Sequence, residues 1–132
     1  MYELIEVTEY MMTRHVKLKN LETGEIEKCF DDSDVQGERD FYFMKMNEVY
    51  DCKICLLGEP VDEDGGDGAI CIVINREVKL GKKMLVEVEV HNNRYFIPQT
   101  TVKEFLNCDN FRFHYFRKDL IQVNDVIHGH FL

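Results

Sequence analysis

Two histidines near the end of the sequence, His128 and His130, are separated by a single glycine. On an extended strand, side chains two residues apart lie on the same face, so both imidazole rings could approach one metal ion. A third ligand could come from His91, His114 or a carboxylate. We expect the two rings to be surface histidines on a last strand, residues 126 to 131, and we predict no metal. His128 and His130 remain the candidate ligands of an alternative, a metal-dependent enzyme.

A second pair of potential ligands, Cys52 and Cys55, has the spacing found in redox motifs and zinc sites. The pair lies inside a predicted strand, residues 50 to 57, where alternation directs the two sulfurs to opposite faces. The other cysteines follow no repeated spacing; they are Cys29, Cys71 and Cys108. An odd number of cysteines, five, in a chain without an export signal indicates reduced thiols. We therefore expect no disulfide and no redox catalysis.

An acidic, glycine-rich segment, residues 58 to 68, invites comparison with calcium-binding loops, because calcium prefers oxygen ligands. A calcium loop of the EF-hand type that starts at Asp62 would place Asp67 at the sixth position, which requires glycine. One that starts at Glu63 would place Ile74 where the bidentate glutamate belongs. The segment can bury too little surface to become ordered, so residues 59 to 68 are predicted to form a mobile loop. The sequence leaves open whether this loop binds a cation.

Nucleophilic and nucleotide chemistry lack the residues that they need. The single serine, Ser33, lies in an acidic stretch without the glycine elbow of a hydrolase. The glycines at positions 65, 66 and 68 stand among carboxylates, which would repel phosphate. We therefore predict no catalytic residue and no cofactor, and we expect a protein that is not an enzyme.

One segment, residues 111 to 118, combines aromatic and basic side chains in a strand pattern. Its odd-numbered aromatic residues point to one side, and Arg112, His114 and Phe116 point to the other. Rings flanked by arginine hold single-stranded nucleic acid on sheet surfaces, and the same mixture is enriched at protein interfaces. In the competing interpretation, Phe116 is covered by the last strand or by a helix. The predicted ligand-binding or partner-binding residues are Arg112, His114, Phe116, Arg117 and Lys118.

The elements around these residues follow the period of strands. Valines alternate with polar residues from Val86 to Val90, and Asn92-Asn93 follows them. Asparagine tolerates the left-handed backbone of a two-residue turn, so residues 84 to 98 are predicted to form an antiparallel hairpin. The apolar run from Ala69 to Ile74 predicts a strand that is buried on both faces.

The first part of the chain predicts one long strand from Tyr2 to Lys19, with a bulge near residue 11. A return strand, residues 25 to 30, places Ile26 and Phe30 on one face. A capping box at Thr101 and Glu104 predicts one short helix near residues 101 to 107.

Length and charge set the class of protein. The chain has 132 residues with 16 basic and 25 acidic side chains, a net charge of -9. We predict a single domain, residues 1 to 132, of the all-β class and mainly antiparallel. The expected architecture is a small β-barrel, OB-like or sandwich-like, with one short helix. No apolar window approaches the length of a membrane span and no signal peptide is seen, which predicts a cytoplasmic protein without membrane contact.

These observations predict a non-catalytic binding or protein-interaction module, with a protein or small ligand of unknown identity as partner. One alternative is an OB-like nucleic-acid-binding barrel that adds Arg76, Lys79, Lys82 and Lys83 to the aromatic segment; the net charge opposes it, because phosphate neutralisation supplies most nucleic-acid affinity. The metal-dependent enzyme is the other. Two observations discriminate among them, whether the basic residues share one face and whether either histidine meets a carboxylate. The oligomeric state is left open.

Overall fold

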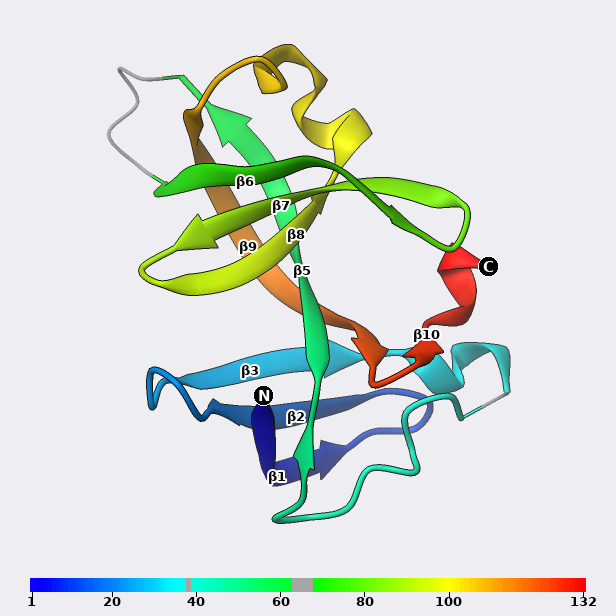
Figure 1. Ribbon diagram of the computed structural model, residues 1–132. Coiled ribbons are helices and arrows are strands. Elements are labelled where there is room, and N and C mark those ends of the chain that lie inside the picture. The colour runs from blue at the N-terminus through cyan, green and yellow to red at the C-terminus, as the bar shows by residue number, and fades with distance from the viewer. Residues whose placement is uncertain (38, 63–67) are drawn as a thin grey trace. The chain divides into compact units, whose positions relative to one another are not determined.

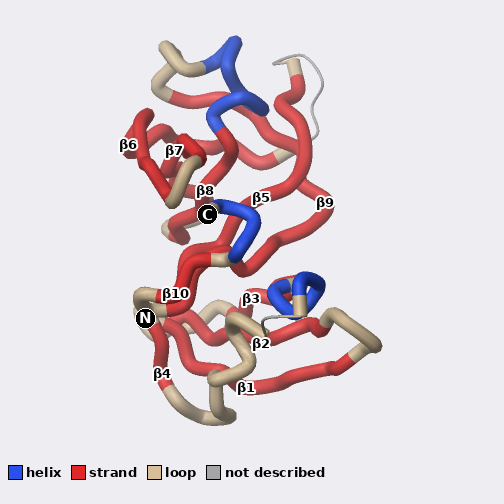
Figure 2. Tube along the Cα trace, turned by 90° about the vertical axis from the view of Figure 1, so that its right-hand side faces the viewer, coloured by secondary structure: helices blue, strands red, loops and turns tan. Residues whose placement is uncertain are grey.

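The computed structural model describes residues 1 to 37, 39 to 62 and 68 to 132. Strands make up most of this part of the chain, and its helical segments are short 3-10 turns (Figures 1 and 2). The all-β class is confirmed, and most neighbouring strands run antiparallel. Within the same residues, no helix has the length and apolar character needed to cross a membrane.

The chain folds into two compact units. Unit 1 comprises Met1–Ile54 and Lys118–Leu132, and unit 2 comprises Cys55–Arg117. Two strands, β5 (Cys52–Val61) and β9 (Asn110–Val123), contribute residues to both units. The length of the chain, from which one domain is predicted, does not indicate this division, and no linker rich in glycine, proline or serine marks either border.

Unit 1 is built mainly from strands that follow one another along the first third of the chain (Figure 1). Its strands are β1 (Tyr2–Glu9), β2 (Arg14–Asn20), β3 (Ile26–Asp31), β4 (Val49–Tyr50), β10 (Val126–Ile127), the beginning of β5 and the end of β9. β4, β1, β2 and β3 are antiparallel neighbours in that order. β3 meets β9 in a parallel bridge, and β10 folds back onto β9.

The predicted long first strand is wrong, because the chain reverses between β1 and β2. The N–H of Tyr10 donates to the carbonyl of Thr13 at 2.8 Å, which closes a tight turn, and Met11 at its tip is 97% exposed. Leu4 and Val16 are both fully buried on the inner face of the resulting hairpin. The alternation of polar and apolar residues continues through both strands, so the pattern does not reveal where the chain turns.

Ile26 and Phe30 share a face of β3, as predicted, but the opposite face of the strand is the buried one. Ile26 is 57% exposed, and the fully buried positions are Glu27, Cys29 and Asp31. Two carboxylates thus occupy positions where apolar side chains are expected. Burial of a carboxylate requires a cationic or hydrogen-bonding partner, and such partners come from other strands.

Arg14 of β2 forms an ion pair with one of these carboxylates, Asp31. Its Nε lies 2.7 Å from Oδ2 of Asp31, and its second guanidinium nitrogen donates to the carbonyl of Phe41 at 2.6 Å. Lys118 of β9 holds the other carboxylate, with its Nζ 2.8 Å from Oε2 of Glu27. Residues distant in the sequence therefore determine which face of β3 is turned inward.

Unit 2 contains the longest strands of the described chain. They are β6 (Ala69–Leu80), β7 (Lys83–Val90) and β8 (Asn93–Pro98), together with most of β5 and of β9. β9 neighbours β5, which is followed by β8, β7 and β6, and β6 pairs with β9 in turn. The pairings of unit 2 thus return to the strand from which they start.

The predicted hairpin is formed by β7 and β8. Its apolar face is buried, since Val86, Val88 and Val90 are at most 3% exposed. The turn lies one residue earlier than predicted, because Val90 pairs with Asn93. His91 and Asn92 occupy it with φ angles of 49° and 69°, the left-handed backbone that such a two-residue turn needs.

The helix after Pro98 is a 3-10 segment, η3 (Gln99–Phe105). The capping box is not formed, because Pro98 stands at the N-cap position and no side chain caps the helix. Thr101 already lies inside the segment, too far along it to act as the cap. Val102 interrupts the helical backbone and is 1% exposed, so burial of this side chain takes precedence over regular helix geometry.

Two further predictions concern chain segments that bear on function. Residues 126 to 131 form a strand only at Val126–Ile127, and a 3-10 turn, η4 (Gly129–Phe131), follows. The predicted mobile loop begins later than expected, because β5 continues through Val61. Residues 63 to 67 of that loop lie outside the described part of the chain.

Candidate functional site

The predicted binding segment lies in β9 and shows the expected alternation. Phe111 and Phe113 are buried, whereas His114 is exposed and Arg112 is half-buried. Phe116 is 74% exposed. The competing interpretation, in which Phe116 is covered by another element, is therefore wrong.

The last two predicted residues have different environments. Arg117 is exposed and ends the part of β9 that belongs to unit 2. Lys118 belongs to unit 1, where it pairs with the buried Glu27 and its side chain is only 19% exposed. Lys118 therefore neutralises a buried carboxylate of unit 1, and it is not a candidate for partner binding.

β6 supplies the neighbours of Arg112, and it overturns another prediction. Ile70, Ile72 and Ile74 are 53%, 48% and 42% exposed, so the strand is buried on one face only, through Cys71. Ile70 pairs across the sheet with Arg112, and Ile72 pairs with Asn110. Paired residues share a face of the sheet. We call Ile70, Ile72, Asn110 and Arg112 the isoleucine–arginine face.

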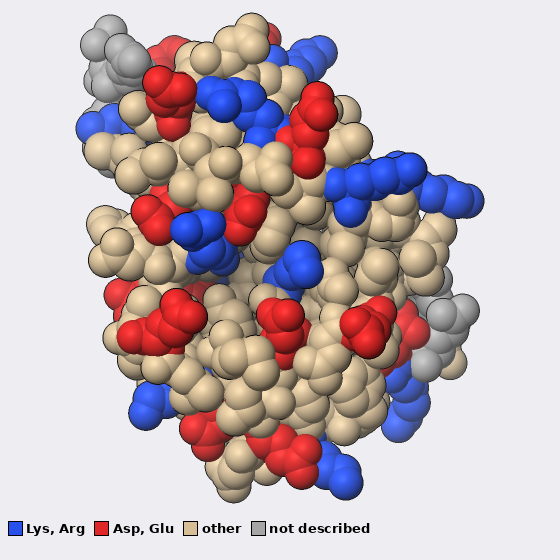
Figure 3. Space-filling view, viewed as in Figure 1, with Lys and Arg blue, Asp and Glu red and all other residues tan. Residues whose placement is uncertain are grey.

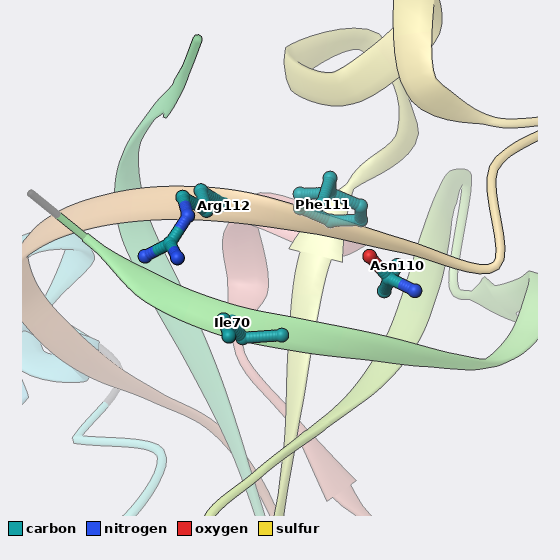
Figure 4. Close-up of a pocket in the computed structure, with 4 residues that line it drawn as sticks. All are labelled: Ile70, Asn110, Phe111 and Arg112. Carbon is teal, nitrogen blue, oxygen red and sulfur yellow. The ribbon is translucent and has the colours of Figure 1, made fainter. Parts of the chain in front are cut away.

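A pocket of about 310 Å³ opens on the isoleucine–arginine face. It is lined by Ile70, Asn110, Phe111 and Arg112, and the side chain of Arg112 extends from β9 toward β6 (Figure 4). Its size is at the lower end of small-ligand pockets, and one amino-acid side chain is a suitable occupant. Among the described residues, the guanidinium of Arg112 has no hydrogen-bond or ion-pair partner.

Charged residues border this face on the side of β7. Glu89 pairs with Ile72 across the sheet. Arg94 of β8 lies 3.4 Å from a carboxylate oxygen of Glu89 and 3.5 Å from one of Glu87. An apolar strip therefore lies between Arg112, a cation without a partner among residues 1–37, 39–62 and 68–132, and the ion pairs of Arg94 with Glu87 and Glu89.

A second candidate site lies in unit 1, where the two histidines meet a carboxylate. Nε2 of His128 is 2.7 Å from Oδ1 of Asp32, which stands just before the 3-10 turn η1 (Ser33–Gln36). The rings of His128 and His130 are 4.8 Å apart between centroids. One ligand atom from each of the three side chains lies within 4.8 Å of the others. We call Asp32, His128 and His130 the histidine cluster.

The end of the chain explains how the two rings come together. His128 is the N-cap of η4, and the N–H of His130 donates to its Nδ1 at 3.1 Å. Asp40 accepts a hydrogen bond from the N–H of Gly129 at 3.2 Å. Because the rings approach through a turn, the predicted reason for their proximity, a shared strand face, is wrong.

Asp32 and His128 shift each other's pKa values. The hydrogen bond with His128 lowers the pKa of Asp32, and the same hydrogen bond raises the pKa of His128. His128 is 4% exposed, so its ring is well shielded, whereas His130 is exposed. Sequence reasoning missed Asp32, since nothing in the acidic stretch around it indicates a contact with residues 96 positions later.

The cysteines fit their predicted reduced state. All five are free in the structure, and all but Cys108 are buried. Burial raises the pKa of Cys52 and of Cys71 to about 12, so these two thiols are protonated at neutral pH. A protonated thiol is a poor nucleophile and a poor metal ligand.

Comparison with known proteins leaves this geometry as the basis for assigning function. No protein-family model, curated protein or solved structure matches the chain.

Proposed function

We propose that this chain is a non-catalytic protein-binding module, and that its isoleucine–arginine face receives a partner segment that is apolar and acidic. The observation that carries the proposal is the exposure of Ile70 and Ile72 beside the guanidinium of Arg112, which has no partner within the part of the chain that the structure describes. The apolar strip contributes hydrophobic area to the interface, and pairing with the cation fixes the orientation of the partner. Arginine and apolar residues in this combination characterise the centres of protein interfaces.

The exposed isoleucines supply the hydrophobic part of the argument. Single exposed apolar side chains are common, but alternate isoleucines along one strand form a continuous strip. Covering such a strip gains roughly 25 cal/mol for each Å² of apolar surface. A partner that contributes one apolar side chain to the pocket would bury Ile70, which is 53% exposed.

The partner binds through the face of the sheet. At Ile72 both edges of β6 are occupied, by β7 and by β9, so an additional strand has no free edge at this position. The guanidinium of Arg112 selects a partner that also carries a carboxylate close to its apolar side chain. Pairing with this carboxylate also fixes orientation, as charge complementarity does at other interfaces.

The finer description of the fold is part of the same proposal. The circuit of pairings from β9 through β5, β8, β7 and β6 supports a small barrel in unit 2. The OB-like or sandwich-like form and the cytoplasmic location stay predictions from the sequence.

Nucleic-acid binding is the outcome that the charge distribution disfavours. Acidic and basic side chains are interspersed on the face of the molecule drawn in Figure 3. Arg76, one of the basic residues considered for nucleic acid, donates to the carbonyl of Leu106 at 2.7 Å and pairs with Asp109 at 3.2 Å. A phosphate backbone requires a row of available cations, which this arrangement does not favour.

Selection of peptides from a displayed random library on the intact protein tests the proposal. We expect the enriched sequences to combine an apolar residue with aspartate or glutamate. Synthetic versions should lose at least about tenfold in affinity toward Ile70→Thr and toward Arg112→Glu, in keeping with the loss of one central contact. Ile26→Thr is the matched control, because Ile26 is also a strand isoleucine and is 57% exposed.

Three results would contradict the proposal. Enriched peptides could be basic, they could bind the Arg112→Glu variant as tightly as the original protein, or Ile26→Thr could weaken them equally. Fluorescence anisotropy with labelled single-stranded DNA and RNA forms the parallel arm. Salt-sensitive micromolar binding that depends on Phe116 would favour the nucleic-acid alternative.

A further inference from the structure

We infer that the histidine cluster, Asp32, His128 and His130, binds a divalent transition-metal ion of the zinc, nickel and copper group. The cluster supplies two imidazole nitrogens and one carboxylate oxygen, with ligand atoms within 4.8 Å of one another. Imidazole nitrogen is preferred by these metals, whereas calcium and magnesium prefer oxygen alone. The site lies in unit 1 and is independent of the binding function proposed for unit 2.

The spacing of the cluster is close to that of a bound site. Metal–ligand bonds of about 2.0 to 2.2 Å place tetrahedral neighbours roughly 3.4 Å apart. The pair formed by His128 and Asp32, now 2.7 Å apart, must open slightly to admit an ion. His130 must move inward, and it is the exposed member of the cluster, so rotation of its side chain meets little resistance.

The hydrogen bonds of His128 predict how the ion enters. Nδ1 of this ring accepts the N–H of His130, so the neutral ring carries its proton on Nε2 and donates it to Asp32. An ion that binds Nε2 displaces this proton, and the neutral ring then holds a proton on Nδ1. A protonated Nδ1 cannot accept from His130. Metal binding therefore releases the backbone of His130, the residue that must move inward.

Aromatic side chains and a hydrogen-bonded turn hold His128 in place beside Asp32. The ring of His128 packs edge-on against Phe41 and Phe131, which limits water around it. The carboxylate of Asp40 accepts the N–H of Gly129, the residue between the two histidines, and so holds the turn in place. The exposed side of His130 leaves room for water as a further ligand, as in metal sites with an open position.

Zinc titration of the intact protein by calorimetry tests this inference. The titration is carried out in a Cys108→Ser background, since Cys108 is the exposed thiol and would compete for zinc. We expect one zinc ion per chain. His130→Ala should lower the zinc affinity at least about tenfold, because even the loss of a residue that only supports a metal ligand has an effect of this size. His130→Cys should retain binding because thiolate is also a zinc ligand. His114→Ala is the matched control, an exposed histidine outside the cluster.

Two further measurements separate a metal site from a structural hydrogen bond. Asp32→Asn keeps an oxygen that accepts from His128, so the fold should persist while zinc affinity falls. Long-range ¹H–¹⁵N spectra should show the proton of His128 on Nε2 without zinc and on Nδ1 with zinc. Absence of one-to-one binding at sub-millimolar zinc, equal affinity of His130→Ala and His114→Ala, or unchanged His128 signals would each overturn the inference.

Discussion

Unit 1 and unit 2 place their polar and apolar side chains in opposite ways. Among the described residues, Asn93 is the single buried polar or charged side chain of unit 2. The corresponding side chains of unit 1 are Arg14, Asn20, Glu27, Asp31, Ser33 and His128. Unit 2 instead exposes isoleucines along the first half of β6, whereas large exposed apolar residues of unit 1, such as Met11 and Phe43, lie mainly in turns.

This difference indicates where specificity resides in each unit. Buried ion pairs contribute little net stability compared with well-packed apolar residues, but removal of one partner is costly. The interior of unit 1 therefore depends on particular partners such as Arg14 and Asp31. An exposed apolar strip stabilises nothing until it is covered, so the strip of unit 2 is available for binding.

Replacement of Asp31 by alanine should have the largest effect on stability. Asp31 is fully buried, pairs with Arg14 at 2.7 Å and also accepts the N–H of Ser33 at 2.9 Å. Its removal leaves a buried guanidinium without its carboxylate, and the free energy of unfolding should fall by about 3 to 5 kcal/mol. Urea denaturation followed by circular dichroism measures this loss.

The double variant Arg14→Met with Asp31→Leu sharpens that result, because apolar replacements of both partners should recover most of the lost stability. A loss below about 1 kcal/mol for Asp31→Ala would indicate a pair that behaves as if exposed to solvent. The contrast between the two units would then be weaker than the burial of their side chains suggests.

Gly58→Ala should have the next largest effect, and it acts in unit 2. A Cβ atom on Gly58 would overlap the carbonyl oxygen of His114 and come within 2.7 Å of the Cα of Tyr115. Both contacts are with backbone, so β5 and β9 would have to separate, at a cost of about 1 to 3 kcal/mol. Gly24→Asn is the control, since its Cβ meets nothing within 4 Å and asparagine tolerates the left-handed backbone there. Equal stability of the two variants in urea would contradict the close approach of these strands.

The third prediction concerns pH and unit 1. The hydrogen bond between Asp32 and His128 lowers the pKa of Asp32 below its ordinary value of 3.8 and raises the pKa of His128 above 6.5. The contribution of His128 to stability is complete below its unfolded pKa and is lost as pH rises through the raised folded pKa. The contribution of Asp32 is complete above its unfolded pKa and is lost as pH falls through the lowered folded pKa.

The stability difference between the original protein and His128→Asn should therefore be largest between about pH 4 and pH 6.5 and smaller near pH 8. Thermal unfolding across this range, in buffers treated with chelator, measures the difference. His114→Asn serves as the control with a histidine in unit 2. If this stability difference does not vary with pH, the protonation of His128 is not coupled to folding, which contradicts the prediction.

Sequence pattern predicts those features that depend on neighbours along the chain. The hairpin of β7 and β8 and the alternation of β9 follow from local period and turn residues, and both are present. The inward carboxylates of β3 could not be predicted, because their partners Arg14 and Lys118 lie on other strands. The contact of Asp32 with His128 spans 96 positions, and no local pattern records it.

The apolar run of β6 shows a different limit of sequence reasoning. A run such as Ile70 to Ile74 has the same composition whether both faces are buried or one face awaits a partner. Period alone cannot distinguish the two, since isoleucine is favoured in strands for its shape as well as for burial. The exposure of alternate residues becomes visible only when the neighbours β7 and β9 are in place.

Ile72→Thr should have the smallest effect on stability and provides the clearest test of the contrast. Ile72 is 48% exposed and paired on both sides, and threonine keeps the β-branched shape that the strand favours. The free energy of unfolding should therefore change by about 0.5 kcal/mol or less, as for most surface substitutions. Urea denaturation measures this change, and Val86→Thr, at a position that is 1% exposed, is the buried control that should lose much more. If Ile72→Thr is as costly as Val86→Thr, the strip is part of the packed interior of unit 2. The apolar residues of β6 would then serve the fold, and the assignment of this face to a partner would have to be abandoned.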